Sequence, residues 1–238
     1  MKRFDSSLSL RGLFSGENRK PTLILLWAPV ALTVWRYYLA GGFFPSRPAS
    51  AALARLGQGG ELLPFLSAFV LLGLASLALI GLVFREPLAA YGLTLGDWRF
   101  GLKALAVTAP VVVVLSAFAS RSPEFVAQYP LSRAVCASAS AFLAYAAAYL
   151  EYYVGFEIFF RGFVQFGLRE RFGDWYAILV QTALSCLVHI GKPSAEIFGA
   201  IVGGVAFGMV AFRSRSLLYV IAAHWLMGVA IDLFICLG

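Results

Sequence analysis

Residues 62–84, LLPFLSAFVLLGLASLALIGLVF, contain no charged side chain. A helix rises about 1.5 Å per residue, so this stretch matches the roughly 30 Å hydrocarbon core of a bilayer. It therefore predicts a transmembrane helix. The rest of the 238-residue chain has the same character, because 61% of its residues are hydrophobic and 13% are charged, whereas soluble domains are about one quarter charged.

Seven apolar stretches reach or approach the roughly 20 residues that span the hydrocarbon core. They are 22–40, 62–84, 103–119, 134–168, 175–190, 197–212 and 217–237. We therefore expect an all-α fold, a polytopic transmembrane helical bundle of about seven membrane helices. We also expect this bundle to form a single domain, residues 22–238, after a polar and basic cytoplasmic segment, residues 1–21.

The lysines and arginines of the loops indicate the orientation, because they concentrate on the cytoplasmic side of a membrane. With the N-terminus in the cytoplasm, twelve of these residues lie in inner segments and six in outer segments. Seven crossings then place the C-terminus outside. The net charge of +7 follows from this topology and from contact with anionic lipids, and no compact basic domain indicates nucleic-acid binding.

The stretch 134–168 is longer than one crossing requires, since about 35 residues make roughly 50 Å of helix. It forms either one tilted or kinked helix, or two passes joined by a turn near Glu151 to Glu157. Two passes would place the later arginine-containing loops outside, against the charge bias. We expect one long helix.

Glycines and cysteines indicate packing. In the sixth stretch, Gly199-x3-Gly203 and Gly204-x3-Gly208 predict a close approach of another helix. The three cysteines form no C-x-x-C or Cys/His cluster, so neither a disulfide framework nor a thiolate metal site is predicted. We interpret them as small buried residues: Cys136, Cys186 and Cys236.

Four ionisable side chains lie at membrane depth in the C-terminal half. Glu157 and Arg161 are four residues apart, so a helix places them on one face, where they can pair. His189 and His224 are the only two histidines. Counted from the nearest cytoplasmic charges, Glu157, His189 and His224 lie roughly 18, 22 and 14 Å along their helices. Because such groups cost at least a few kcal/mol in hydrocarbon, they require a partner or a function.

A carboxylate and two imidazoles suit hydrolysis. Glu157 can take a proton from water, the histidines can hold that water or the developing oxyanion, and Arg161 can orient Glu157. No cofactor is expected. The alternative is a zinc ion bound by the glutamate and both histidines with one open position, although no H-E-x-x-H helix occurs.

Other polar and aromatic residues nearby are interpreted mainly as structural. Glu151 points elsewhere on its helix. Asp232, two turns beyond His224, is equally a structural partner or a site residue. The remaining positions are packing residues or border the outer mouth: Ser185, Cys186, the Phe and Tyr residues of 152–166, Lys192 and Glu196.

Residues 85–235 resemble the CPBP family, the CAAX protease and bacteriocin-processing group of intramembrane glutamic endopeptidases. The family pattern consists of Glu-Glu-x3-Arg, Phe-x3-His and His-x3-Asn/Asp, each on its own membrane helix. The corresponding stretches here are Phe156-Glu157-x3-Arg161-Gly162, Ser185-x3-His189 and His224-x3-Gly228. The resemblance implies an intramembrane endopeptidase that hydrolyses a membrane-anchored or membrane-inserted peptide or protein, and we expect it in a bacterial inner membrane.

The chain is a divergent member by this comparison. Phe156 stands at the position of the glutamate that activates water in the family, and Ser185 stands at the position of the phenylalanine. Gly228 replaces the Asn or Asp that helps to bind the oxyanion, with Asp232 as a partial substitute. The role of general base therefore falls to Glu157.

Two other functions fit the same residues. A Glu, an Arg and two His at membrane depth can form the relay of a proton-coupled transporter, although no inverted repeat is visible. Phe156 and Gly228 fit a noncatalytic binding or immunity protein. We predict the endopeptidase, with catalytic residues Glu157, His189, His224 and Arg161.

Overall fold

The computed structural model describes residues 9–40 and 62–238. Within these ranges every regular element is a helix and no strand occurs, so the predicted all-α fold is confirmed. Two parts of the predicted topology lie outside the described residues: segment 1–8 with Lys2 and Arg3, and connection 41–61 with Arg47 and Arg55.

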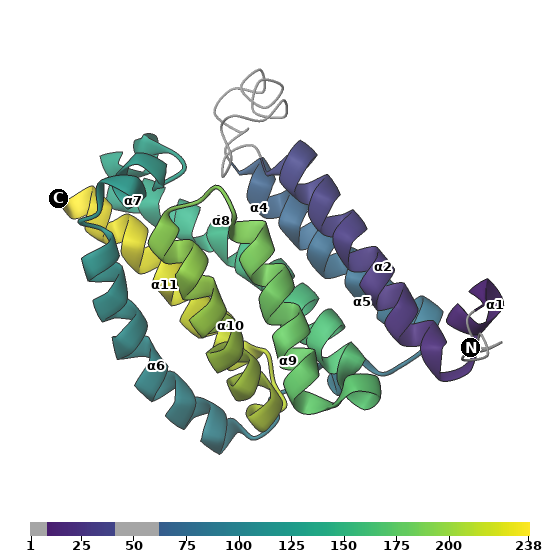
Figure 1. The fold of residues 1–238 in the computed structure, drawn as a ribbon. Helices are drawn as coiled ribbons and strands as arrows, with labels where there is room; N and C mark the ends of the chain where they lie inside the picture. Colours follow the sequence, from purple (N-terminus) through teal and green to yellow (C-terminus); the bar gives the residue numbers. More distant parts are fainter. Residues whose placement is uncertain (1–8, 41–61) are drawn as a thin grey trace, which may run out of the picture.

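The helices pack side by side as a bundle (Figure 1). Elements labelled α are α-helices, and those labelled η are 3-10 or π helices. In chain order they are α1 (Leu10–Leu13), η1 (Gly16–Asn18), α2 (Arg19–Val34), η2 (Trp35–Leu39), α4 (Leu63–Ala68), η4 (Phe69–Leu74), α5 (Ala75–Ala78), η5 (Leu79–Phe84), η6 (Leu88–Tyr91), α6 (Trp98–Ala119), α7 (Pro123–Gln128), η7 (Arg133–Ala137), α8 (Ala139–Glu157), η8 (Ile158–Phe166), α9 (Gly167–His189), α10 (Ser194–Ser214) and α11 (Leu218–Leu237).

Five helical segments among the described residues are long and apolar enough to cross a membrane. They are Gly16–Leu39, Leu63–Phe84, Trp98–Ala119, Ser194–Ser214 and Leu218–Leu237. The other two predicted crossings, 134–168 and 175–190, are also largely helical, as α8 with η8 and as the second part of α9, but they are not among these five. The protein is therefore an integral membrane protein with a polytopic helical bundle.

The loops at one end of the bundle are joined by main-chain hydrogen bonds. The Leu217 N–H donates to the Gly92 carbonyl at 2.9 Å, and the Asp97 N–H donates to the Ser214 carbonyl at 2.7 Å. Asp97 also caps α6, and the N–H of Phe100, followed by the Arg213 guanidinium, lowers the pKa of its carboxyl group. These contacts hold the start of α11, which carries His224, against the loop before α6.

Side-chain hydrogen bonds join the loops at the opposite end of the bundle, where the C-terminus lies (Figure 1). Arg36 of η2 donates to the carbonyls of Val188 and Ile190, the two residues on either side of His189. Glu124 of α7 accepts from the N–H of Ser194 at 2.8 Å, which holds the start of α10. The ends of η2, α7, α9 and α10 thereby lie around the turn that follows His189.

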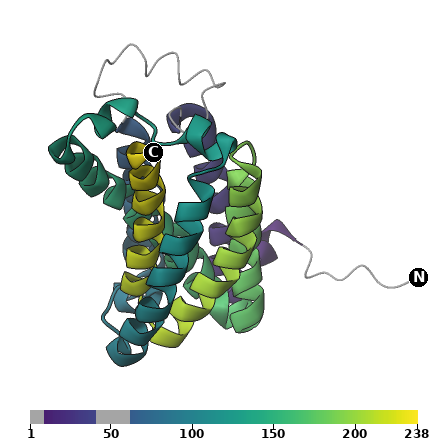
Figure 2. The ribbon, with the colours of Figure 1, turned by 90° about the vertical axis from the view of Figure 1, so that its left-hand side faces the viewer.

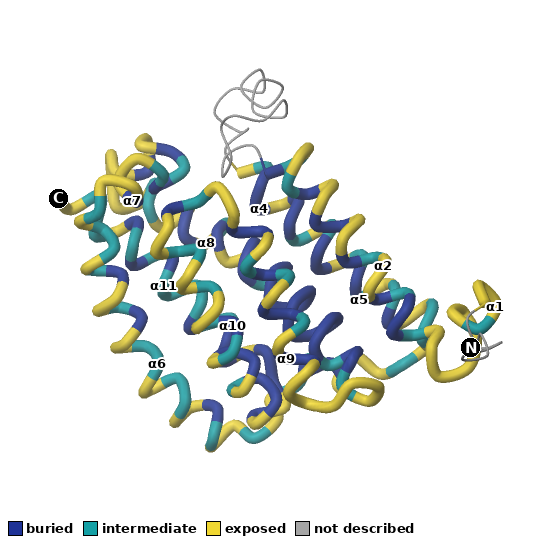
Figure 3. The backbone as a smooth tube through the Cα atoms, in the orientation of Figure 1, coloured by how far each residue is buried: buried dark blue, intermediate teal, exposed yellow. Residues whose placement is uncertain are grey.

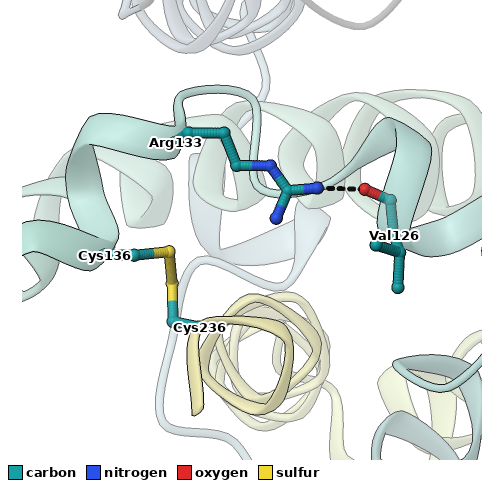
Figure 4. Close-up of a disulfide and its surroundings, with 4 residues drawn as sticks. All are labelled: Val126, Arg133, Cys136 and Cys236. Atoms are coloured by element: carbon teal, nitrogen blue, oxygen red, sulfur yellow. Dashed lines mark hydrogen bonds between the residues drawn. A yellow bond between two sulfur atoms is a disulfide. The ribbon is translucent and has the colours of Figure 1, made fainter. Parts of the chain in front are cut away.

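Two of the three cysteines form a disulfide at this end. Cys136 of η7 is bonded to Cys236 near the end of α11, beside the hydrogen bond from Arg133 to the Val126 carbonyl (Figure 4). The prediction that no disulfide occurs is therefore wrong. The two residues are 100 positions apart in sequence, and only the packing of η7 on the end of α11 brings them together. Cys186 is a free cysteine. The predicted burial of all three is wrong, because Cys186 and Cys236 are partly buried and Cys136 is exposed.

The predicted long helix is one pass through the bundle. Ser138 caps its start, where its hydroxyl accepts from the Ala141 N–H at 3.2 Å. The helix continues from α8 through the π-helical η8 into α9, and the chain reverses at Gly173, whose φ is 77° and ψ 170°. The alternative with a turn near Glu151 to Glu157 is therefore wrong, and the helix begins at Ala139 because residues 133–137 form η7.

Only one of the two predicted glycine pairs makes a close helix contact. A side chain at Gly204 would meet Thr182 of α9 at 2.8 Å, and one at Gly208 would meet the Gln165 side chain at 2.7 Å. Gly199 and Gly203 have no atom within 4 Å of this position, so the packing prediction is wrong for that pair. Gly203 directly precedes Gly204, so it lies on a different face of α10.

The most deeply buried part of the chain is the joint between α8 and η8. Figure 3 shows buried backbone concentrated there and in the neighbouring part of α9, whereas α6 is mostly exposed or half-buried. α6 packs on α11 (Figure 2), where the Ser116 hydroxyl donates to the Met227 carbonyl at 3.0 Å. The predicted site residues occur on the helices that surround this joint.

Candidate active site

Gly155 sets how closely α8 approaches the preceding helices. A side chain at this position would meet the Ala68 carbonyl oxygen and the Phe69 Cα, both at 2.7 Å. Since backbone atoms cannot move aside as a flexible side chain can, α8 lies directly on α4 and η4. This contact fixes the helix two residues before Glu157.

Glu157 is the centre of a buried cluster. Its carboxylate is 0% exposed. Oε1 accepts from Arg161 Nη1 at 2.9 Å and lies 2.7 Å from His224 Nδ1. Oε2 is buried without a hydrogen-bond partner among the described residues. The predicted Glu157–Arg161 pair therefore forms, and His224 joins it from α11.

Aromatic rings surround this cluster. The Arg161 guanidinium lies 6.0 Å from the Phe156 ring centre and 5.8 Å from that of Phe207. The His224 imidazole packs on Tyr153, with centroids 4.6 Å apart, and on Phe156 at 5.4 Å. The cluster is thus enclosed by apolar surface, where ion pairs and hydrogen bonds are stronger than in water.

His189 belongs to a second cluster, nearer the end of the bundle where the C-terminus lies (Figure 1). Its Nδ1 lies 2.6 Å from the Ser185 carbonyl oxygen, and its Nε2 lies 3.8 Å from Glu196 Oε1. The Glu196 carboxylate also accepts from Lys192 Nζ at 2.7 Å and from the Tyr129 hydroxyl at 2.8 Å. Burial raises the pKa of the Tyr129 phenol, as does the adjacent carboxylate. The protonated phenol is therefore a donor in this cluster.

Phe156 contacts both imidazoles. Its ring meets His224 and His189 edge-on, with centroids 5.4 and 6.0 Å apart. The structure thus places both histidines against one buried residue next to Glu157. Within 9–40 and 62–238, no group of three or more His, Cys, Asp or Glu side chains is arranged to hold a metal ion.

The other predicted positions lie around these clusters. Glu151 is exposed on α8, away from Glu157. Asp232 is fully buried on α11 and interacts with Tyr149 and Tyr153. Ser185 contributes its main-chain carbonyl and not its hydroxyl. The Phe and Tyr side chains of 152–166 form core and not a lipid-facing surface, apart from the half-buried Phe166.

The sequence interpretation missed the role of a tyrosine stripe that leads to Glu157. Tyr145, Tyr149 and Tyr153 precede Glu157 at a constant spacing of four, so successive members of the series lie one helical turn apart and contact one another. The signal was visible in the sequence. It was missed because aromatic residues in a membrane helix usually indicate packing.

The hydrogen bonds fix the histidine tautomers. A carboxylate and a carbonyl only accept, so the Nδ1 atoms of both His224 and His189 carry the proton. In its neutral form each imidazole therefore offers Nε2 as an acceptor. The Arg161 charge already balances Glu157, which favours neutral His224. The set can accept protons from water at Glu157 Oε2 and at the imidazoles.

The fold and this set of contacts define a class, an integral membrane protein with a buried acid–base cluster between its helices. Residues 138–230 match the family model described as Type II CAAX prenyl endopeptidase Rce1-like. The predicted resemblance to CAAX-type membrane proteases is thus confirmed over these residues, which contain Glu157, Arg161, His189 and His224. No curated protein and no solved structure gave a significant match.

Proposed function

We propose that this protein is an intramembrane endopeptidase that hydrolyses membrane-associated peptides or proteins. Glu157 is the general base, Arg161 orients it, His189 shares the attacking water and His224 lies beside the reacting carbonyl. The observation that carries the proposal is the asymmetry of the Glu157 carboxylate. Arg161 and His224 occupy Oε1, while Oε2 is buried without a protein partner.

An unpartnered oxygen on a buried carboxylate is costly, by about 1–3 kcal/mol or more for a charged group. Such a cost is common at functional sites, where a polar group is held ready for a substrate or a water molecule. Because Arg161 and His224 hold the other oxygen, Oε2 has a fixed direction. This arrangement suits removal of a proton from a water molecule during attack on a peptide carbonyl.

The orientation of the protein is part of the proposal. The N-terminus lies in the cytoplasm and the C-terminus lies outside, in a bacterial inner membrane. Disulfides persist in oxidising compartments such as the periplasm, and the pair Cys136–Cys236 lies at the end of the bundle assigned to the outside. This agrees with the distribution of positive charges.

The test uses purified protein in proteoliposomes with internally quenched peptides. One probe carries a farnesylated C-terminal Cys-aliphatic-aliphatic-X sequence, and a second set carries an N-terminal acyl anchor. We expect the wild-type protein to cleave at least one of them. Glu157→Gln, His189→Ala and His224→Ala should each abolish cleavage and leave the protein folded by circular dichroism.

Glu151→Gln is the matched control, because it removes an exposed carboxylate from the same helix. It should cleave at the wild-type rate. Full activity in Glu157→Gln would contradict the proposed base, and no cleavage of any probe by the wild-type protein would contradict the protease. Proton-gradient-driven uptake that is lost in Glu157→Gln would instead identify a transporter.

A second function is favoured by one specific contact. Phe156 fills the space beside both imidazoles with an apolar ring, which suits a noncatalytic protein that binds a peptide without cutting it. Binding of the farnesylated probe without cleavage, unchanged in Glu157→Gln, would support this function over proteolysis.

A further inference from the structure

Tyr153 lies closer to His224 than any other ring that contacts this imidazole. Its ring centroid is 4.6 Å from that of His224, against 5.4 Å for Phe156 and 5.6 Å for Phe207. Tyr153 is 4% exposed and lies one helical turn before Glu157 on the same face of α8. Its phenol is therefore held beside the buried cluster.

The tyrosine and a glycine of α11 interlock. A side chain at Gly228 would collide with the phenolic oxygen of Tyr153 and would meet its Cζ at 2.8 Å. The phenol thus occupies the space that any residue other than glycine would fill. Gly228 is one turn after His224, so the Tyr153 hydroxyl and the imidazole lie along one face of α11.

A neighbouring tyrosine orients the hydroxyl. Tyr149 hydrogen-bonds to the Tyr153 side chain, and the two rings lie 4.7 Å apart. When the Tyr149 hydroxyl donates, the Tyr153 oxygen accepts and its own O–H is left to donate elsewhere. A phenol has one donor and can accept as well.

The cluster otherwise lacks a neutral donor for negative charge. Nδ1 of His224 is committed to Glu157, and its Nε2 carries no proton in the neutral form. The Arg161 Nη1 is also committed to Glu157, and Gly228 has no side chain. Arg161 Nε has no hydrogen-bond partner among the described residues, but it belongs to the cation that pairs with Glu157. Among the groups that contact His224, the Tyr153 hydroxyl is thus the neutral donor.

We propose that Tyr153, seated in the space above Gly228, donates its O–H to the oxyanion that forms on the substrate carbonyl. This inference rests on the proposed protease function. It assigns a further catalytic residue and explains why glycine is required at position 228.

The proposed reaction is ordinary amide hydrolysis. The oxygen of water bonds to the carbonyl carbon while Glu157 takes one proton, and the carbonyl π pair moves to the oxygen, which accepts from Tyr153. When that pair returns, the carbon–nitrogen bond breaks and the amine nitrogen takes the proton from Glu157. The products are a carboxylic acid and an amine.

Cleavage of the farnesylated and acyl-anchored quenched peptides in proteoliposomes tests the assignment. We expect Tyr153→Phe to lower kcat by about 10²–10³-fold, the usual cost of one oxyanion donor, with KM nearly unchanged. Tyr219→Phe is the matched control. It removes a buried phenol of α11 whose hydroxyl donates to the Leu95 carbonyl at 2.9 Å, so its kcat should stay within about twofold of wild type.

The two levels of the proposal fail differently. Wild-type kcat in Tyr153→Phe, with cleavage still lost in Glu157→Gln, would overturn the role of Tyr153 and leave the protease intact. No cleavage by the wild-type protein would overturn both. The variant Tyr153→Ala/Gly228→Asn puts an amide donor into the vacated space, and it should cleave at least tenfold faster than Tyr153→Ala.

The contact between the Tyr153 phenol and Gly228 can also be tested by thermal stability, without measuring activity. Gly228→Ala should lower the melting temperature, because its methyl group displaces the phenol, and the same change in a Tyr153→Ala background should cost much less. Equal losses in both backgrounds would show that Tyr153 does not occupy this space. The coupling between the two changes is the quantity measured.

Discussion

The two buried clusters differ in how completely their hydrogen bonds are satisfied. We call the group around Glu157, Arg161 and His224 the inner cluster, and the group around His189, Lys192 and Glu196 the outer cluster. In the outer cluster, Glu196 accepts from Lys192 and from Tyr129. In the inner cluster, Glu157 accepts at one oxygen only, and Arg161 Nε is also buried without a hydrogen-bond partner among the described residues. The carboxylate of the outer cluster is thus hydrogen-bonded at both oxygens, whereas the carboxylate of the inner cluster has one oxygen without a partner among the described residues.

This difference indicates which cluster acts on a substrate. A satisfied network rigidifies a fold, while unsatisfied buried groups persist where a ligand completes them. The two histidines are divided between the clusters, and Phe156 contacts both. We infer that the outer cluster holds His189 in place, while the inner cluster supplies the general base.

The largest stability effect should come from removing the cation of the inner cluster. Arg161→Met leaves the fully buried Glu157 without its ion pair, which should cost about 3–5 kcal/mol. Lys192→Met should cost less, because the side chain of Glu196 is 19% exposed and keeps Tyr129 as a donor. The free energies of unfolding in detergent provide the comparison.

A control separates lost charge balance from lost packing. The double variant Glu157→Gln/Arg161→Met removes both charges and should recover much of the stability lost in Arg161→Met. A larger loss of unfolding free energy in Lys192→Met than in Arg161→Met would contradict the view that the inner cluster depends more on its cation.

An intermediate effect should follow from reducing the disulfide beside the outer cluster. Reduction should destabilise the fold by about 2–4 kcal/mol, since the bridge closes a long loop. The melting temperature with and without dithiothreitol measures this. Cys136→Ser/Cys236→Ser should show no response to the reductant and should still cleave the peptide probes, because the inner cluster is unaffected. Lost cleavage in this folded variant would contradict the division of roles.

The smallest effect should come from an exposed ion pair outside both clusters. The pKa of Asp97 is lowered in the folded protein, so its contribution to stability is present above its ordinary pKa and is lost as the pH falls through the lowered value. The melting temperature of Asp97→Asn should therefore decline slightly less on acidification than that of the wild type. Equal declines would show that Asp97 contributes nothing.

Much of the fold could be predicted from the sequence because the membrane imposes strong patterns. Apolar length located the helical stretches, and the loop charges favoured one long helix over two passes at 134–168. The disulfide could not be predicted, because Cys136 and Cys236 meet only through the packing of η7 on α11. The predicted helix contact at Gly199 and Gly203 was wrong for a related reason. A motif of small residues does not specify which face of the helix meets a neighbouring helix.

The candidate site could be predicted in part. Glu157 and Arg161 are four residues apart, and this spacing predicted their ion pair. The similar depth of His224 in the membrane suggested that it could reach them. Depth could not assign the direction of His189, which depends on the turn after α9 and on the position of Glu196. The interlock of Tyr153 with Gly228 required the structure, because a missing side chain on one helix gives no signal for the side chain that fills its space.

The most direct measurement compares peptide cleavage by Glu157→Gln and Glu151→Gln in the same proteoliposomes. Both variants replace a carboxylate of α8 by an amide, one in the inner cluster and one on the exposed surface. We expect Glu157→Gln to lose about 10²–10⁴-fold or more in kcat, the contribution of a general base, and Glu151→Gln to match the wild type. Equal cleavage by Glu157→Gln and the wild type would contradict Glu157 as the base.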